Sequence, residues 1–212
     1  MGIPVLILGE SGSGKSTSMR NFQPGEIGIV YVSKKPLPFR SKIKTMNTDR
    51  YEEIESALVR GKCKTYVIDD CQYLMANEFM RNAKVTGYQK FTDIGLNFWT
   101  LVQVVINQLP QDTVVYFMAH TERDQNGNEK MKTIGRMLDE KITVEGMFTI
   151  VLKTQVKDGK YSFVTQTNGF DTVKSPMGMF GQLEIDNDLK MVDNAIREYY
   201  YLNEEEQSDD RS

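Results

Sequence analysis

Short apolar runs alternate with longer segments of mixed character along the first 120 residues of the chain. Four such runs occupy residues 4–8, 28–32, 65–70 and 113–119, and each has about the length of one β-strand. Runs that are apolar at successive positions are typical of parallel strands buried on both faces. Because helical segments lie between them, the pattern predicts βαβ units and an α/β fold with a mostly parallel central sheet.

The segments between these runs carry apolar residues at the spacing of amphipathic helices. One helix is expected directly after the first strand, through about Asn21. A second is expected to be capped by Asp49 and to end at Gly61. A longer helix is expected from about Asp93 to Leu109, where Pro110 ends it. Its apolar stripe consists of Ile94, Phe98, Leu101, Val105 and Leu109.

The pattern changes after residue 120. Asn126-Gly127 predicts a tight turn between polar flanks. Residues 148–152 and 161–165 flank Lys157-Asp158-Gly159-Lys160, which predicts a β-hairpin. A final helix is expected from about Asn187 to Tyr200. We expect residues 1–202 to form a single domain and the acidic tail, residues 203–212, to be disordered.

The segment Gly9-Glu10-Ser11-Gly12-Ser13-Gly14-Lys15-Ser16 follows the first strand and matches the complete P-loop pattern. Its glycines let backbone N–H groups turn inward around phosphate oxygens, where a side chain would block the approach. We expect Lys15 to contact the β and γ phosphates, Ser16 to ligate Mg²⁺, and the following helix to add its positive end. Residues 9–17, with Thr17 as the last, are therefore predicted to bind ATP or a close relative with Mg²⁺. The alternative, a flexible Gly/Ser turn, does not explain why the pattern lies between a strand and a helix.

Two carboxylates end the third predicted strand. Asp69 is predicted to hold the Mg²⁺, because in P-loop proteins an aspartate at the end of a neighbouring buried strand does this, usually through water. Hydrolysis also needs a group that activates the attacking water, and Asp70 is the candidate by position. The alternative for Asp70 is an ordinary loop acid.

His120, the one histidine of the chain, ends the fourth predicted strand. A polar group there can contact the γ-phosphate or the attacking water, so we predict a sensor role for His120, with Thr121 as a weaker candidate. A structural histidine is the alternative. Arg123, Arg136 and Lys141 could each provide a cation to a neighbouring subunit in an oligomer, because an added cation stabilises transition-state charge. Each of them can equally be a solvated surface cation.

Residues 27–48 contain no acid but include Lys34, Lys35, Arg40, Lys42 and Lys44, together with Phe39. Cations beside an aromatic ring suit single-stranded DNA, whose backbone is charged and whose bases stack on rings. This basic segment is therefore one predicted DNA contact, with a solvated or nucleotide-proximal loop as the alternative. The loop from Arg81 to Lys90 is a second candidate.

Composition narrows the class of protein further. The 212 residues are 40% hydrophobic and 26% charged, as expected of a globular protein. The net charge of −3 is concentrated in the last ten residues, which hold five acids and one base. No apolar run reaches membrane-spanning length and the start lacks signal-peptide features, so we expect a cytoplasmic protein without a membrane partner. Cys63 and Cys71 have no metal-ligand spacing, which argues against zinc.

The P-loop near the N-terminus, the Val67-Ile68-Asp69-Asp70 ending and the Ala119-His120 ending resemble the small phage-type P-loop ATPases of the RecA-like/AAA class. Some of these act as single-strand annealing proteins in phage recombination. Residues 169–176 and the hairpin before them are similar to the C-terminal part of that group, so the resemblance extends from Ile3 to about Pro176. It implies a RecA-like core, ATP, Mg²⁺, side-by-side assembly into a homo-oligomer, and single-stranded DNA as partner.

The chain departs from this resemblance at one position. RecA-like enzymes place a water-activating Glu at the end of the second strand, where this chain has Ser33-Lys34-Lys35. Our favoured prediction is an ATP-binding, Mg²⁺-dependent ATP hydrolase that acts on single-stranded DNA in phage recombination or replication. The alternatives are a nucleotide-gated binding module with negligible turnover and a nucleoside or nucleotide kinase. Against the kinase, the sequence has no arginine-rich lid, and one strand between the P-loop and Asp69 resembles the additional-strand ATPases.

Overall fold

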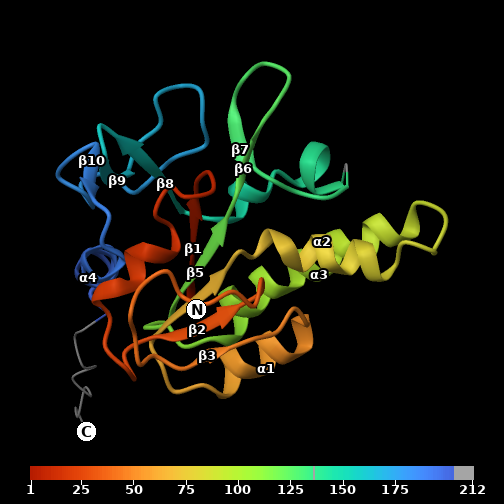
Figure 1. Ribbon diagram of the computed structural model, residues 1–212, viewed down its shortest axis with the longest axis horizontal. Coiled ribbons are helices and arrows are strands. Elements are labelled where there is room, and N and C mark those ends of the chain that lie inside the picture. The colour runs from red at the N-terminus through yellow and green to blue at the C-terminus, as the bar shows by residue number, and fades with distance from the viewer. Residues whose placement is uncertain (136, 203–212) are drawn as a thin grey trace, which may run out of the picture.

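A mostly parallel sheet forms the centre of the computed structural model, which describes residues 1–135 and 137–202. In the described residues the strand order is β10-β9-β8-β1-β5-β4-β2-β3 (Figure 1). Pairs from β8 through β3 are parallel, whereas β8–β9 and β9–β10 are antiparallel. The α/β class with a mostly parallel sheet is therefore confirmed. The strands are β1 Ile3–Leu8, β2 Gly28–Tyr31, β3 Thr45–Met46, β4 Thr65–Asp69, β5 Val114–Ala119, β8 Ile150–Lys157, β9 Lys160–Val164 and β10 Glu184–Asp186.

The strand that carries the P-loop and the strand that ends in Asp69 are separated by one strand. β5 pairs with β1 on one side and with β4 on the other. The strand order agrees with the additional-strand arrangement expected from the sequence. However, β2, which intervenes in the sequence, lies on the far side of β4, and the strand that separates the two motifs in space is β5.

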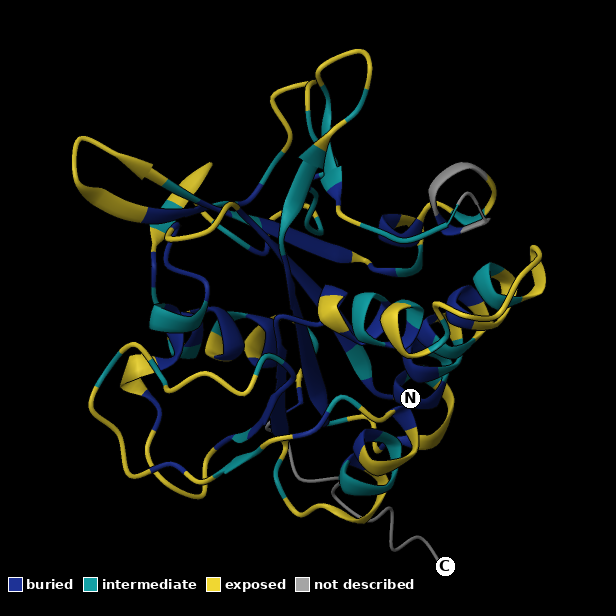
Figure 2. Ribbon diagram, turned by 45° about the vertical axis from the view of Figure 1, so that its right-hand side comes forward, coloured by how far each residue is buried: buried dark blue, intermediate teal, exposed yellow. Residues whose placement is uncertain are grey.

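Helices cover both faces of the sheet (Figure 1). The helices α1 Tyr51–Arg60, α2 Gln72–Arg81 and α3 Gln89–Gln108 lie on one face, and the 3₁₀ helix η1 Ser16–Asn21 and α4 Leu189–Tyr199 lie on the other. Alternate residues of β1 enter two separate cores, with Leu6 and Leu8 toward α1–α3 and Val5 and Ile7 toward η1 and α4. β4 and β5 are buried at every position and β1 at all but its first, while the outer loops are largely exposed (Figure 2).

Two predictions about helices need correction. Asp49 does not cap α1, whose N-cap is Arg50 without a side-chain cap hydrogen bond. The Asp49 carboxylate instead accepts hydrogen bonds from Arg81 at 2.6 Å and Asn77 at 3.0 Å, so it joins the α1 turn to α2. After the P-loop the chain forms the six-residue 3₁₀ helix η1, so any dipole contribution there is weaker than that of a long α-helix.

The longer predicted helices lie close to their expected positions. α3 begins at Gln89, earlier than expected, and its predicted stripe is buried against the sheet. α4 begins two residues later than expected, and Asp188 caps it by accepting from the backbone N–H groups of Lys190 and Met191. Among the described residues, no helix combines the length and apolarity needed to cross a membrane.

Both predicted turns are present. The Asn126-Gly127 turn joins β6 Thr121–Arg123 to β7 Glu129–Met131 in a separate two-stranded sheet. The hairpin of β8 and β9 turns through Asp158 and Gly159, which have φ of 53° and 76°. Its strands extend to Lys157 and Lys160, which the sequence pattern had placed in the turn. A π-helix, η2 Met137–Ile142, and a 3₁₀ helix, η3 Val144–Met147, precede β8. The predicted acidic tail, 203–212, and Arg136 lie outside the described residues.

Candidate nucleotide-binding site

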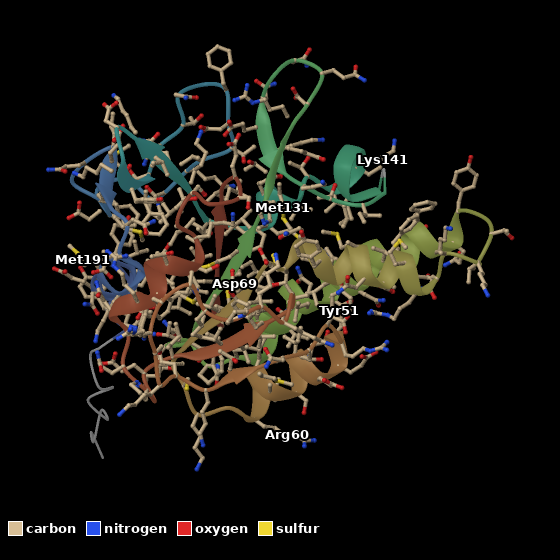
Figure 3. The ribbon with its side chains drawn as sticks, in the orientation of Figure 1. Tyr51, Arg60, Asp69, Met131, Lys141 and Met191 are labelled. Carbon is tan, nitrogen blue, oxygen red and sulfur yellow. The ribbon has the colours of Figure 1, made fainter. Side chains whose placement is uncertain are left out.

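The P-loop lies at the carboxyl edge of the sheet, where the parallel strands β1, β4 and β5 end. The predicted site residues follow directly from these strand ends: Gly9 after β1, Asp70 after β4 and His120 after β5. Figure 3 shows Asp69, the last residue of β4, in the middle of the molecule. Ligands of open parallel sheets bind outside the carboxyl ends of the strands, which makes this edge the place to look for a site.

Two glycines of the P-loop, Gly9 and Gly14, lie so close to neighbouring atoms that a side chain would not fit at either position. Gly14 has φ of 96°, and a Cβ there would lie 2.8 Å from Tyr161, so any other residue would be strained. A Cβ at Gly9 would lie 2.0 Å from the Thr154 hydroxyl of β8. Ser13 shares a 2.6 Å hydrogen bond with Thr154, so its hydroxyl is engaged with β8. The sequence analysis missed Thr154, because nothing near it in the chain signals that β8 lies beside the loop.

Lys15 lies inside the loop. Its ammonium donates hydrogen bonds to the carbonyl oxygens of Gly9 at 2.7 Å and Glu10 at 2.8 Å, and the residue is only 6% exposed. Burial lowers the pKa of Lys15, although the charges of Asp70 and Asp69 oppose this effect. The lysine is thus positioned by main-chain oxygens at the centre of the loop predicted to surround phosphate.

Ser16 and Asp69, the two predicted Mg²⁺ ligands, are in direct contact. The Ser16 hydroxyl donates to Asp69 Oδ2 at 2.7 Å, and Asp69 Oδ1 is buried without a partner among the described residues. Burial raises the pKa of Asp69 to about 6, although the hydrogen bond from Ser16 opposes the shift. These oxygen donors and the unsatisfied buried oxygen fit Mg²⁺, which prefers oxygen ligands.

The described residues contain no cluster of three or more His, Cys, Asp or Glu that could hold a metal by themselves. Mg²⁺ is commonly bound by one or two protein groups together with substrate phosphates and water. Ser16 and Asp69 therefore suit a metal that arrives with a nucleotide.

The side chains of Asp70 and His120 are in contact at the same edge, with His120 Nε2 lying 3.2 Å from Asp70 Oδ1. Asp70 has a left-handed backbone with φ of 60° in the turn between β4 and α2. Burial raises the pKa of Asp70, but the hydrogen bond from His120 and the nearby charge of Lys35 outweigh this effect, and the net pKa is below its usual value. The backbone N–H of His120 donates to Gln72 Oε1 at 3.2 Å and so holds the end of β5 against α2. Thr121, the weaker sensor candidate, begins β6 and is half-buried.

A cleft of about 430 Å³ opens over these groups. It brings together Lys15, Asp70 and His120, which come from separate parts of the sequence. From the basic segment, Lys35 also lines it, whereas Arg40, Lys42 and Lys44 are exposed and do not. The lining consists of Ser11, Gly12, Gly14, Lys15, Ser16, Thr17, Tyr31, Lys35, Pro36, Pro38, Asp70, His120 and Tyr161.

A second hollow of about 410 Å³ adjoins the first, and Thr17 and Tyr161 line both. Asn187 and Met191 line its other side, together with Arg20. Asn187 is 3% exposed, and its side-chain nitrogen has no hydrogen-bond partner among the described residues. The Arg20 guanidinium donates to the Asn187 carbonyl at 2.5 Å, which joins η1 to the turn before α4. No local sequence pattern predicted this hollow.

The remaining candidate residues lie elsewhere. Arg123 forms a 3.3 Å ion pair with Glu129 on the β6–β7 hairpin. Lys141 is exposed on η2, and Figure 3 shows it well apart from Asp69. In the loop from Arg81 to Lys90, Arg81 is paired with Asp49, and Tyr88 is 90% exposed.

No family model matches the sequence. No curated protein matches it either. A solved structure of a KaiC-like protein from the hyperthermophilic archaeon Pyrococcus horikoshii is similar, with 14% sequence identity over 77% of each chain and a TM-score of 0.46. At this identity and TM-score, we base no functional conclusion on the likeness.

Proposed function

We propose that this chain binds MgATP in the 430 Å³ cleft and hydrolyses it. The observation that carries the proposal is the convergence of Lys15, Asp70 and His120 on one cleft beside the Ser16–Asp69 pair. In this proposal the P-loop N–H groups and Lys15 bind the phosphates, and Ser16 and Asp69 hold Mg²⁺, which offsets phosphate charge.

The nucleoside is expected to extend from Thr17 into the second hollow. In this proposal the terminal phosphates lie near Lys15 and the nucleoside lies toward Thr17 and Tyr161, which line both spaces. The Tyr161 ring offers a stacking surface for a base, and the unpartnered Asn187 nitrogen is a hydrogen-bond donor near it.

A competition experiment separates these two parts of the site. Lys15→Ala should weaken binding of both ATP and inorganic tripolyphosphate, which has no base. Tyr161→Ala should weaken ATP binding about fivefold or more, as expected for loss of one stacked base, while tripolyphosphate binding stays within twofold. Tyr88→Ala, on an exposed loop, serves as the control. If Tyr161→Ala weakens the binding of ATP and of tripolyphosphate equally, the base does not bind in the second hollow.

For hydrolysis, Asp70 is the proposed base and His120 the group that orients it and contacts the terminal phosphate. A water oxygen attacks the γ-phosphorus, the bond from that phosphorus to the β–γ bridging oxygen breaks, and the water proton passes to Asp70. Asp70→Asn should then reduce phosphate release far more than ATP affinity. If Asp70→Asn lowers phosphate release and ATP affinity to the same extent, Asp70 is not the base.

A second candidate function is a nucleotide-gated binding module with negligible turnover. It is favoured by the lowered pKa of Asp70, because a carboxylate that is stabilised by His120 is a weak base. Phosphate release by the wild-type chain, compared with Lys15→Ala, distinguishes the two functions. Release equal to that of the variant would support the binding module.

We further propose that single-stranded DNA is the partner, with the chain assembled side by side in an oligomer. The support is the exposed Arg40, Lys42, Lys44 and Lys84 and the exposed ring of Tyr88. ATPase activity measured with and without single-stranded DNA tests the partner. Stimulation is expected, and unchanged activity together with absent binding would contradict it.

A further inference from the structure

Lys35 lines the cleft, and no other cation of the basic segment does. Three residues, Val32, Ser33 and Lys34, separate Lys35 from the end of β2, and Lys34 has a left-handed backbone with φ of 55°. Such a conformation is uncommon for a residue with a side chain and costs free energy, so the surrounding structure has to hold it. The next residue, Lys35, lines the cleft together with Lys15, Asp70 and His120.

Contacts place the Lys35 ammonium on the Asp70 and His120 side of this cleft. It lies 5.8 Å from the centroid of the Tyr73 ring, and that ring meets His120 edge-on at 6.3 Å. The positive charge of Lys35 also acts on Asp70, whereas that of its neighbour Lys34 acts on Asp49, outside the cleft. In the described part of the chain, Lys35 is exposed and forms no salt bridge. Its charge is therefore free to meet an anion in the cleft.

We propose that Lys35 contacts the terminal phosphate of a nucleoside triphosphate bound to the same chain, and so distinguishes a triphosphate from a diphosphate. The inference rests on the proposed function, which places the terminal phosphate near Lys15 and the Asp70–His120 pair. An ammonium is a compact point charge suited to phosphate, and a fixed cation beside a phosphoryl group stabilises the charge of its transfer.

This role has three consequences within the molecule. First, the cation at the terminal phosphate comes from the same chain, whereas the sequence analysis considered Arg123, Arg136 or Lys141 of a neighbouring subunit. Second, the position at the end of the second strand, which in RecA-like enzymes carries an acid, here supplies a phosphate-binding cation. Third, Lys35 is withdrawn from the set of proposed DNA contacts, which leaves Lys34, Arg40, Lys42 and Lys44 of the basic segment.

The experiment compares ATP and ADP affinity in Lys35→Met, Lys35→Arg and Lys42→Met. Lys42 lies on the same segment, is exposed and does not line the cleft, so Lys42→Met removes the same charge without the proposed contact. Lys35→Met should lower ATP affinity about tenfold, as expected for loss of one charge-assisted hydrogen bond, and change ADP affinity less than twofold. Lys35→Arg should restore most of the ATP affinity, and Lys42→Met should change neither.

An equal loss of ATP and ADP affinity in Lys35→Met, or no loss, would overturn the inference while leaving the cleft as the ATP site. A loss of similar size in Lys42→Met would also overturn it, because the effect would then be long-range charge. Failure of the wild-type chain to bind ATP or inorganic tripolyphosphate has a different meaning, since it would reject the proposed function itself.

Discussion

Asp69 is the residue at which stability and the proposed function conflict most clearly. Its carboxylate is almost completely buried, it has one hydrogen bond to Ser16, and its Oδ1 has no partner among the described residues. A buried charge without full pairing is costly, and the raised pKa of about 6 expresses that cost. A bound cation would offset the charge of this carboxylate and supply a partner for Oδ1.

The pH dependence of stability follows from this raised pKa. The folded-state pKa of about 6 exceeds the ordinary value of 3.8, so the folded state holds the proton more tightly, and the contribution of Asp69 to stability decreases as pH rises from about 4 to 6. Asp69→Asn should therefore increase the free energy of unfolding, by about 1–2 kcal/mol more at pH 8 than at pH 5.

Urea denaturation in Mg²⁺-free buffer at these two pH values tests the prediction. Asp112→Asn is the control, because the hydrogen bond from Lys64 lowers the pKa of Asp112, so that its carboxyl is ionised at both pH values. This variant should lower the free energy of unfolding by the same amount at pH 5 and at pH 8. If Asp69→Asn destabilises the protein equally at both pH values, the buried carboxylate is not the cause of the dependence.

At the scale of elements, α4 is attached to the sheet by a buried polar network. Arg197 donates to Asp193 at 2.7 Å and to the backbone carbonyls of Asp112 and Lys64 at the amino-terminal edge of the sheet. Asp193 also accepts from Tyr116 of β5 and Thr65 of β4. The network thus ties the last helix to two central strands.

Arg197→Met should destabilise the protein by about 3–5 kcal/mol, because it leaves the Asp193 carboxylate buried without its cation. The double variant Arg197→Met with Asp193→Leu should recover part of this loss. Thermal or chemical denaturation measures both, and Lys64→Ala, which removes an exposed ion-pair partner, should change stability by less than about 1 kcal/mol. A double variant no more stable than the single one would show that the hydrogen bonds of Arg197, rather than its charge, matter.

The β8–β9 hairpin depends on the backbone of Gly159. With φ of 76° and no atom within 4 Å of an added Cβ, the cost of a side chain there is conformational alone. Gly159→Ala should lower the free energy of unfolding by about 1 kcal/mol, measured as a lower Tm. Gly181→Ala, which has equal space and no positive φ, should be nearly neutral. Similar effects at both positions would contradict the role of the left-handed backbone.

At the scale of the whole molecule, the proposed DNA contacts lie on segments that leave the sheet. The helices α2 and α3 extend away from it and end in the loop that contains Lys84 and Tyr88 (Figure 1). This placement leaves the Tyr88 ring exposed, while the proposed nucleotide-binding cleft lies at the sheet edge.

Single-stranded DNA binding should therefore weaken steeply as salt increases and should respond to ATP. Tyr88→Ala should lower DNA affinity about fivefold or more, as expected for one stacked base, without a change in ATP affinity. Fluorescence polarisation of a labelled oligonucleotide at two salt concentrations measures this, with Tyr201→Ala, exposed near the end of α4, as control. If binding is absent or does not depend on salt, single-stranded DNA is not the partner.

Much of the fold could be predicted, because it depends on local patterns. The apolar runs predicted β1, β2, β4 and β5, and the stripe from Ile94 to Leu109 predicted α3, since burial on one or two faces imposes these periodicities directly. α2 and the short strands β3 and β10 had no prediction. The cap at Asp49 was wrong because its carboxylate pairs with Arg81, a partner 32 residues away that no local pattern reveals.

Residues adjacent in the chain were enough to predict the P-loop, the carboxylates at the end of β4 and the histidine at the end of β5. The contacts between distant segments became apparent only in the folded chain: Asp70 pairs with His120, Thr154 supports the loop, and Lys35 lines the cleft. These contacts depend on strand order and on backbone conformations such as the left-handed Lys34, which set which distant side chains meet.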